Sequence, residues 1–332
     1  MTDRINFAVD LIPPEPTQVP VLSKLFEESD FDTLYIADVD FERDVYVSIT
    51  QAVLSTKRIK IGTGVTNPLT RHPITTAIAI STLSELSGGR MVLALGTGDY
   101  HIMRKLSLLP EKPLRALKEA VFIIREFLEN KEINFEGTYF KVFNTKAKEE
   151  NKYNIPILIA GKGQMLLKLA GRIGDGVYLD AIPLSLVEEI KSLISVGAKK
   201  AGKSVDDLYL VNVIPIAISN NKEEALRLAA PQTIYAIGSL PEYIHQKLRI
   251  DEEVIKAVRE SLPDFEKAAK HLPLDVIEMF SITGTSEECI EKIDKFRKKG
   301  VNELAFILPK VKNLPDFVNL LHTKVIMYFK ET

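Results

Sequence analysis

Apolar residues fall in short, nearly unbroken runs that alternate with longer amphipathic stretches along the whole chain. The eight apolar runs cover residues 5–12, 33–37, 59–66, 91–98, 155–160, 176–179, 208–218 and 303–308. Unbroken runs of this length are typical of parallel strands that are buried on both faces. Eight such strands, each followed by helical sequence, predict a (β/α)8 TIM barrel of the α/β class.

The amphipathic stretches predict the helices between these strands. They cover residues 19–28, 46–56, 73–86, 114–128, 165–173, 186–201, 222–228 and 287–299. Thr285 and Glu288 have the spacing of a capping box at the start of the last helix, and Gly300 follows its end. A doubly wound sheet is the alternative arrangement, but no Gly-x-Gly-x-x-Gly pattern follows the first strand.

We expect residues 1–332 to form one barrel domain with two insertions. Residues 130–153, after the fourth strand, contain the pattern of a small hairpin. Residues 229–278, after the seventh strand, have the pattern of a helical insertion. Loops that follow the strand ends surround the active site of such barrels, so the second insertion is predicted to cover the substrate.

Composition narrows the classes of partner. The chain carries 27% charged residues that nearly balance, with a net charge of −2, so neither a nucleic-acid nor a membrane partner is predicted. Cys289 is the single cysteine and the N-terminus has no signal-peptide pattern, which together predict a cytoplasmic protein without disulfides. The five histidines lack metal-ligand spacing, so no metal site is predicted.

Two successive strands end in the same Gly-Thr-Gly pattern. Gly64 closes this pattern at the end of the third strand, and Gly98 closes it about one βα unit later. Glycines at matching strand ends leave bare backbone at one level of the barrel. The repeat therefore predicts a surface that a flat ligand can approach closely.

Carboxylates follow several strand ends. Asp10, Asp38, Asp99 and Asp180 all stand where the active site of a barrel is built. An aspartate at such a position can equally cap the next helix, so each has two interpretations. We favour a site role for Asp99, because the glycines before it clear space around it, whereas Tyr35 and Tyr46 are expected to be packing residues.

A further candidate is the turn after the fifth strand, Gly161-Lys162-Gly163-Gln164. A glycine turn with a lysine at the start of a helix is suited to bind phosphate. A plain connection between strand and helix is the alternative.

The chain resembles the luciferase-like barrel superfamily, and within it the reductases of methylenetetrahydromethanopterin that use the deazaflavin coenzyme F420. The segments that carry the resemblance are 62–68 (GTGVTNP), 70–73 (TRHP), 86–90 (LSGGR), 96–99 (GTGD), 136–139 (EGTY), 165–171 (MLLKLAG), 175–177 (DGV) and 280–284 (FSITG). Together they span nearly the whole chain.

The resemblance implies specific site residues. It implies a non-prolyl cis peptide at Gly64-Val65, where the deazaflavin ring would be supported, and places the coenzyme phosphate at the turn after the fifth strand. Asp10 and Asp99 would be the functional carboxylates. The residues expected to line the coenzyme are Asp38, Thr63, Gly64, Val65, Asn67, Gly98, Gly161, Lys162, Gly163 and Gln164. Relatives of this kind are usually homodimers or homotetramers.

The function that the resemblance implies is hydride transfer between reduced F420 and the methylene carbon of a tetrahydropterin derivative. Val39 stands where alcohol-oxidising relatives carry a histidine base, which argues against alcohol dehydrogenation. Two alternatives remain at this point: an FMN-dependent monooxygenase of the same superfamily, and a barrel that binds a cofactor without catalysis.

Overall fold

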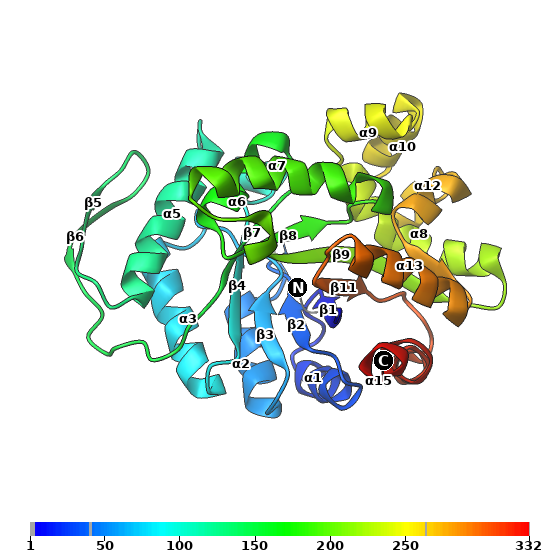
Figure 1. The fold of residues 1–332 in the computed structure, drawn as a ribbon, viewed down its shortest axis with the longest axis horizontal. Coiled ribbons are helices and arrows are strands. Elements are labelled where there is room, and N and C mark those ends of the chain that lie inside the picture. The colour runs from blue at the N-terminus through cyan, green and yellow to red at the C-terminus, as the bar shows by residue number, and fades with distance from the viewer. Residues whose placement is uncertain (1–3, 40–41, 263, 332) are drawn as a thin grey trace.

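A computed structural model describes residues 4–39, 42–262 and 264–331. Within these ranges, eight parallel strands close into a barrel in which each strand pairs with the next and the last pairs with the first (Figure 1). The strands are β1 (Asn6–Leu11), β2 (Thr33–Ile36), β3 (Lys60–Thr63), β4 (Met91–Leu95), β7 (Ile157–Ala160), β8 (Gly176–Asp180), β9 (Tyr209–Ile218) and β11 (Glu303–Ile307). The predicted (β/α)8 barrel is confirmed.

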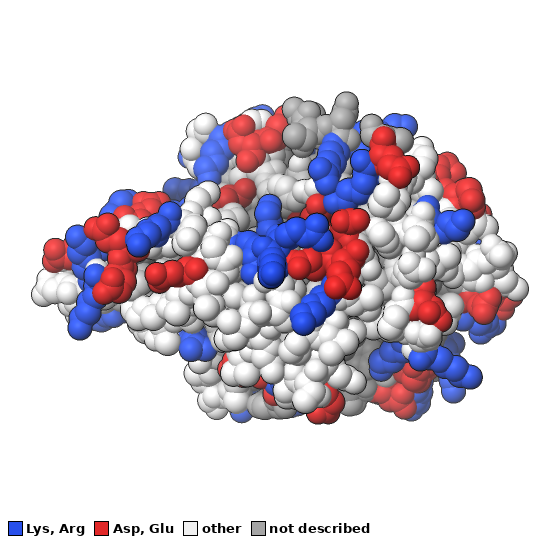
Figure 2. Space-filling model, turned by 90° about the horizontal axis from the view of Figure 1, so that it is seen from below, with Lys and Arg blue, Asp and Glu red and all other residues white. Residues whose placement is uncertain are grey.

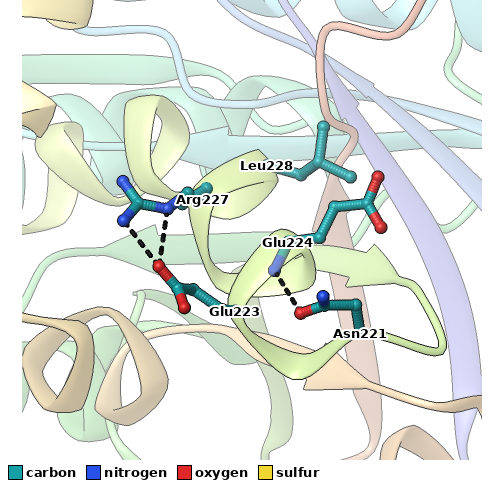
Figure 3. Close-up of a pocket in the computed structure, with 5 residues that line it drawn as sticks. All are labelled: Asn221, Glu223, Glu224, Arg227 and Leu228. Atoms are coloured by element: carbon teal, nitrogen blue, oxygen red, sulfur yellow. Dashed lines mark hydrogen bonds and ion pairs between the residues drawn. The ribbon is translucent and has the colours of Figure 1, made fainter.

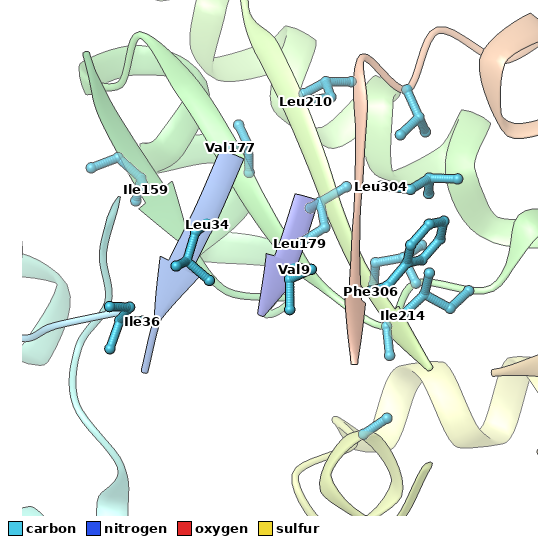
Figure 4. Close-up of a cluster of buried hydrophobic side chains, with 14 of the residues drawn as sticks. Val9, Leu34, Ile36, Ile159, Val177, Leu179, Leu210, Ile214, Leu304 and Phe306 are labelled. Atoms are coloured by element: carbon cyan, nitrogen blue, oxygen red, sulfur yellow. The ribbon is translucent and has the colours of Figure 1, made fainter. Parts of the chain in front are cut away.

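Helices surround the strands and cover the outer face of the barrel. They are α1 (Val19–Glu28), α2 (Val45–Ser55), α3 (Pro73–Ser87), α5 (Pro113–Leu128), α6 (Gln164–Ile173), α7 (Val187–Lys200), α8 (Lys222–Gly238), α13 (Ser286–Lys298), α14 (Leu314–Leu321) and α15 (Met327–Glu331). Thr285 and Glu288 form the predicted capping box of α13. Alternate strand residues such as Val9, Leu34 and Phe306 are fully buried in the layer between strands and helices (Figure 4).

The opposite face of each strand lines the lumen of the barrel, which holds a second and smaller core. Its members are Ala8, Tyr35, Val92, Ala94, Leu158, Ala160, Tyr178, Val211, Val213 and Ala305. Most of these side chains are small or branched, and the two tyrosine rings fill the space between them. The rings of Tyr35 and Tyr178 meet edge to face, with centroids 4.9 Å apart. The interior is therefore a packed core and not a pore.

Several elements differ from the sequence prediction, which also gave no range for the C-terminal helices α14 and α15. Helix α8 continues ten residues beyond the predicted end at residue 228 and contains Pro231 in its interior, where proline usually interrupts a helix. A three-residue strand, β10 (Ile282–Gly284), pairs with β9 and is too short to give a clear pattern. The short helix α4 (Tyr100–Lys105) follows β4 and was also not predicted.

The two additional segments have the predicted secondary structure. The hairpin of β5 (Ile133–Glu136) and β6 (Lys141–Thr145) projects from one side of the barrel, at the left in Figure 1. The other segment contains the end of α8 and four short helices, α9 (Glu242–Leu248), α10 (Glu252–Ser261), α11 (Phe265–Ala269) and α12 (Leu274–Met279). The assignment of the chain to one domain with two insertions stays a prediction.

In the described part of the chain, no helix is both long enough and apolar enough to cross a membrane. The cytoplasmic location stays a prediction.

Candidate active site

Asp10 lies at the carboxyl end of β1, above the tyrosines of the lumen. Its Oδ2 atom accepts a hydrogen bond of 3.0 Å from the hydroxyl group of Tyr178. Its Oδ1 atom lies 3.1 Å from the point where a Cβ atom at Gly64 would stand. The end of β1 therefore meets the end of β3 at a carboxyl group, as the strand-end prediction expects.

The surroundings of Asp10 change its acidity. The pKa of Asp10 is raised to about 7. Burial is the largest cause, the hydrogen bond from Tyr178 acts in the opposite direction, and the negative charge of Asp180 contributes to the rise. A carboxyl group with a pKa near neutrality can both hold and release a proton at physiological pH. Asp10 thus has the property of a general acid or base.

The peptide bond between Gly64 and Val65 is cis, as the resemblance implies. Glycine is required at position 64 because a Cβ atom there would stand 2.7 Å from the Cβ atom of Tyr35 and 3.0 Å from the hydroxyl oxygen of Tyr178. Val65 lies over Gly96, where an added Cβ atom would come within 3.2 Å of the valine side chain. Gly64 and Val65 are partly exposed, so both remain accessible from the mouth.

Asp38 lies beside this peptide at the end of β2. Its Oδ2 atom accepts a hydrogen bond of 2.7 Å from the hydroxyl group of Thr66, and burial raises the pKa of Asp38. Arg71, whose guanidinium carbon lies 4.2 Å from the ring centroid of Tyr46, lowers that pKa by its charge. Asp38 therefore belongs to the same mouth as Asp10.

Thr63 and Asn67, both predicted to line the coenzyme, use their side chains within the protein. The Thr63 hydroxyl group donates to the carbonyl oxygen of Ala94 at 2.7 Å and accepts from the Ala94 amide at 2.9 Å. Asn67 Oδ1 accepts hydrogen bonds from the amides of Leu69 and Thr70. Thr63 is fully buried, so its side chain shapes the strand end and does not reach a ligand.

Gly98 and Asp99 turn the chain from β4 into α4. Gly98 adopts a positive φ of 82°, which favours glycine. Asp99 is exposed and caps α4, because its Oδ1 atom accepts from the amides of His101 and Ile102 at 2.8 and 3.1 Å. The structure therefore gives Asp99 the capping role that the prediction had set second, and its catalytic role stays a prediction.

The turn after β7 contains an ion pair that the sequence did not reveal. The ammonium group of Lys162 lies 2.6 Å from Asp180 Oδ2 and donates to the carbonyl oxygen of Ala236, at the end of α8. The lysine side chain is only 8% exposed. The hydroxyl group of Tyr243, on α9, donates to the carbonyl oxygen of Lys162. Lys162 therefore joins the turn to the helical segment.

Gly161 and Gly163 give this turn two different properties. A Cβ atom at Gly161 would stand 2.0 Å from the side chain of Leu166, so the turn packs closely on α6. Gly163 precedes α6 and has open space around it. No side chain caps α6, and its first turn has no acidic residue, so its first amides and its positive dipole end are available to an anion.

A groove of about 590 Å³ opens beside the start of α6. It is lined by Leu114, Gly163, Gln164, Met165, Leu166, Pro241, Glu242, Tyr243 and Gln246. A second pocket, of about 380 Å³, lies at the start of α8, where Arg227 pairs with Glu223 and Asn221 caps the helix (Figure 3). Its walls all belong to residues 221–228, and none of the predicted site residues lines it. In the described residues, no cluster of acidic, histidine or cysteine side chains could hold a metal ion.

Tyr178 is a residue of this site that the sequence prediction did not include. It lies two residues before Asp180 on β8 and thus faces the lumen, like Asp180. That alternation was visible in the sequence, but the partner of the hydroxyl group depends on how β1 and β8 face each other across the barrel.

Comparisons with known proteins identify the family of this chain. The family described as luciferase-like monooxygenase matches residues 6–303. The 5,10-methylenetetrahydromethanopterin reductase of Archaeoglobus fulgidus is 33% identical over 98% of this chain and all of its own length. The reductase of the same name from Methanopyrus kandleri is 30% identical over 98% of this chain and 99% of its own.

The solved structures give the same result. The coenzyme F420-dependent tetrahydromethanopterin reductase from Methanopyrus kandleri superposes with a TM-score of 0.88 at 28% identity, over 98% of this chain and 99% of that one. The family model and the reductase from Archaeoglobus fulgidus each cover most of the chain. The chain belongs to the luciferase-like monooxygenase family, and within it it is similar to the methylenetetrahydromethanopterin reductases.

Proposed function

We propose that this protein is a coenzyme F420-dependent oxidoreductase that acts on a CH–NH group. It transfers a hydride between reduced F420 and the methylene carbon of a tetrahydropterin of the methanopterin type. The observation that carries the proposal is the meeting of Asp10 with the bare backbone of Gly64, in a chain similar over nearly its whole length to reductases of that name.

The residues at the mouth suit a coenzyme that has a flat ring and a phosphate group. Gly64 and Val65 offer partly exposed backbone beside Asp10, with Asp38 at the neighbouring strand end. The uncapped start of α6, with the open space at Gly163, suits a phosphate group. Lys162 would not bind that phosphate directly, because its ammonium group is already bound to Asp180 and Ala236.

When F420 is bound, it supplies the hydride, and the protein supplies position and protons. Opening a methylene bridge between two nitrogens leaves one nitrogen that needs a proton as the carbon becomes a methyl group. Asp10 is the residue suited to hold that proton, since its pKa lies near 7. The packed lumen limits the access of water from below Asp10.

Two measurements test this function. Oxidised F420 added to the purified protein should show a saturable change in its absorbance, whereas FMN under the same conditions should not. The protein should then oxidise reduced F420 when methylene-tetrahydromethanopterin is added and fail to do so with the methyl compound. Binding of FMN but not F420 would overturn the proposal.

We also propose that the protein is a homodimer or homotetramer. Helix α2 contains no charged residue and α3 contains one, while Val47, Leu54, Ile78 and Leu86 on these helices are 49–67% exposed. Figure 2 views the molecule from below Figure 1, where α1 and α2 lie, and shows a broad area without acidic or basic side chains. Light scattering after gel filtration should give a mass of at least two chains, and Leu54→Glu should lower it.

A further inference from the structure

We infer that Tyr178 is a positioning residue for Asp10. Its hydroxyl group holds one oxygen of the carboxyl group so that the other stays against Gly64, at the peptide where the coenzyme ring would lie. The inference rests on the proposed function for its consequence in catalysis, but its geometric part concerns this chain alone.

The two oxygens of Asp10 have different surroundings. Oδ2 accepts the hydrogen bond of 3.0 Å from Tyr178, and Oδ1 borders Gly64. The Tyr178 hydroxyl oxygen also borders Gly64, at 3.0 Å from the position of the missing Cβ atom. The phenol therefore fixes the rotation of the carboxyl group at the point where β1, β3 and β8 come together.

The ring of Tyr178 is itself held firmly. Tyr178 is 4% exposed, pairs in the sheet with Ala160 on one side and Val211 on the other, and packs edge to face on Tyr35. The hydroxyl group of Tyr35 points to a different partner, the Glu303 carboxylate at the base of the barrel, at 3.2 Å. The hydroxyl groups of these two neighbouring tyrosines thus donate to carboxyl groups at opposite ends of the lumen. Of the two, Tyr178 is the one that reaches Asp10.

The charges around Asp10 are few. Asp180 raises the pKa of Asp10 from β8, and Lys162 pairs with Asp180 from the turn after β7. The hydrogen bond from Tyr178 lowers the pKa, because it stabilises the ionised carboxylate. Loss of this hydroxyl group should therefore raise the pKa of Asp10, whereas loss of the Tyr35 hydroxyl group should leave it unchanged.

The experiment compares Tyr178→Phe with Tyr35→Phe, two substitutions that each remove one buried oxygen from the same core. Carbon-13 NMR of protein labelled at the aspartate carboxyls, without coenzyme, follows the signal that disappears in Asp10→Asn. We expect the midpoint of this signal to rise by about one pH unit in Tyr178→Phe and to stay within about 0.3 unit in Tyr35→Phe. The pH profile of turnover should shift in the same direction, with kcat lowered at least about tenfold.

Equal shifts in both variants, or no shift in Tyr178→Phe, would overturn the inference. If Tyr178→Phe does not fold, 3-fluorotyrosine placed at position 178 provides a second test: its more acidic phenol should donate a stronger hydrogen bond and lower the midpoint of Asp10. If the wild-type protein fails to bind F420, the proposed function fails, and the NMR comparison still decides the role of Tyr178.

Discussion

The ammonium group of Lys162 lies 2.6 Å from Asp180 Oδ2, and both residues stand at the mouth of the barrel. The pair joins the turn after β7 to the end of β8, and the second hydrogen bond of Lys162 extends this connection to the end of α8. The sequence pattern suggests Lys162 as a phosphate ligand. In the structure, its ammonium group instead connects the barrel to the helical segment by internal hydrogen bonds.

Lys162→Met should weaken the connection between the barrel and the helical segment. The change removes the ion pair of Asp180, which keeps only the long hydrogen bond of 3.5 Å from Ser239, and removes the lysine donor from the carbonyl oxygen of Ala236. We expect a loss of about 1–3 kcal/mol in the free energy of unfolding. Hydrogen exchange should become faster in residues 236–243 and stay the same in β1–β4. The same substitution at Lys200, an exposed residue in the last turn of α7, should change neither quantity.

Gly64→Ala should disturb both stability and binding. The added Cβ atom would stand 2.7 Å from Tyr35 Cβ, which the strand backbone holds in place, so we expect a loss of about 1–3 kcal/mol. Affinity for F420, measured by absorbance titration, should fall at least about tenfold. Gly163→Ala is the control for stability because its Cβ atom enters open space, and its melting temperature should remain close to that of the wild type.

Thr63→Val should destabilise the end of β3 without removing a ligand contact. The Ala94 amide loses its hydrogen-bond acceptor, whereas the Ala94 carbonyl oxygen keeps the hydrogen bond from the Thr66 amide. A buried unsatisfied amide costs about 1–3 kcal/mol. Urea unfolding should show a large loss for Thr63→Val and about 1 kcal/mol or less for Thr63→Ser, which keeps the hydroxyl group. A Thr63→Ser protein with strongly reduced F420 affinity would contradict this assignment.

Asp10→Asn should lower the activity of the protein and raise its stability at alkaline pH. The pKa of Asp10 is raised from 3.8 to about 7 in the folded protein, so the folded state binds an extra proton between about pH 4 and pH 7. Stability from this group is present at low pH and is lost as the pH rises through that window. The cost at pH 8 is roughly 2–4 kcal/mol.

The asparagine removes this cost, so the variant should melt above the wild type at pH 8 and near it at pH 4.5. Its kcat with the pterin substrate should fall at least about 100-fold, as for the loss of a general acid. Wild-type activity in the variant would show that the Asp10 carboxyl group is not used in the reaction. Equal melting curves at pH 8 would show that burial of the ionised carboxyl group does not destabilise the fold.

The sequence was sufficient to predict the eight strands, because buried parallel strands are continuously apolar and need no knowledge of their neighbours. It was less informative for α8, since Pro231 reads as a helix end although the surrounding helix continues to Gly238. From the local sequence, a proline predicts a helix end because it lacks an amide hydrogen. In the folded protein, the packing of the whole segment maintains the helix across Pro231.

The strand-end rule brought Asp10, Asp38 and Gly64 to one mouth, and the structure agrees. It did not distinguish Asp99, which caps α4, from Asp10, which meets Tyr178. A helix N-cap depends only on the cap residue and the three residues after it, so the capping role of Asp99 could have been predicted from the sequence. The partner of Asp10 could not, because it comes from a strand 168 residues away along the chain.

The packed tyrosines of the lumen have a consequence for the order of events. Because Tyr35 and Tyr178 close the barrel below Asp10, reactants can enter and leave only through the mouth. A coenzyme ring bound at Gly64 would lie at the closed bottom of the mouth, beneath a substrate that binds after it. In that arrangement the coenzyme would arrive before the pterin and depart after the product, so the proposed function predicts compulsory-ordered kinetics.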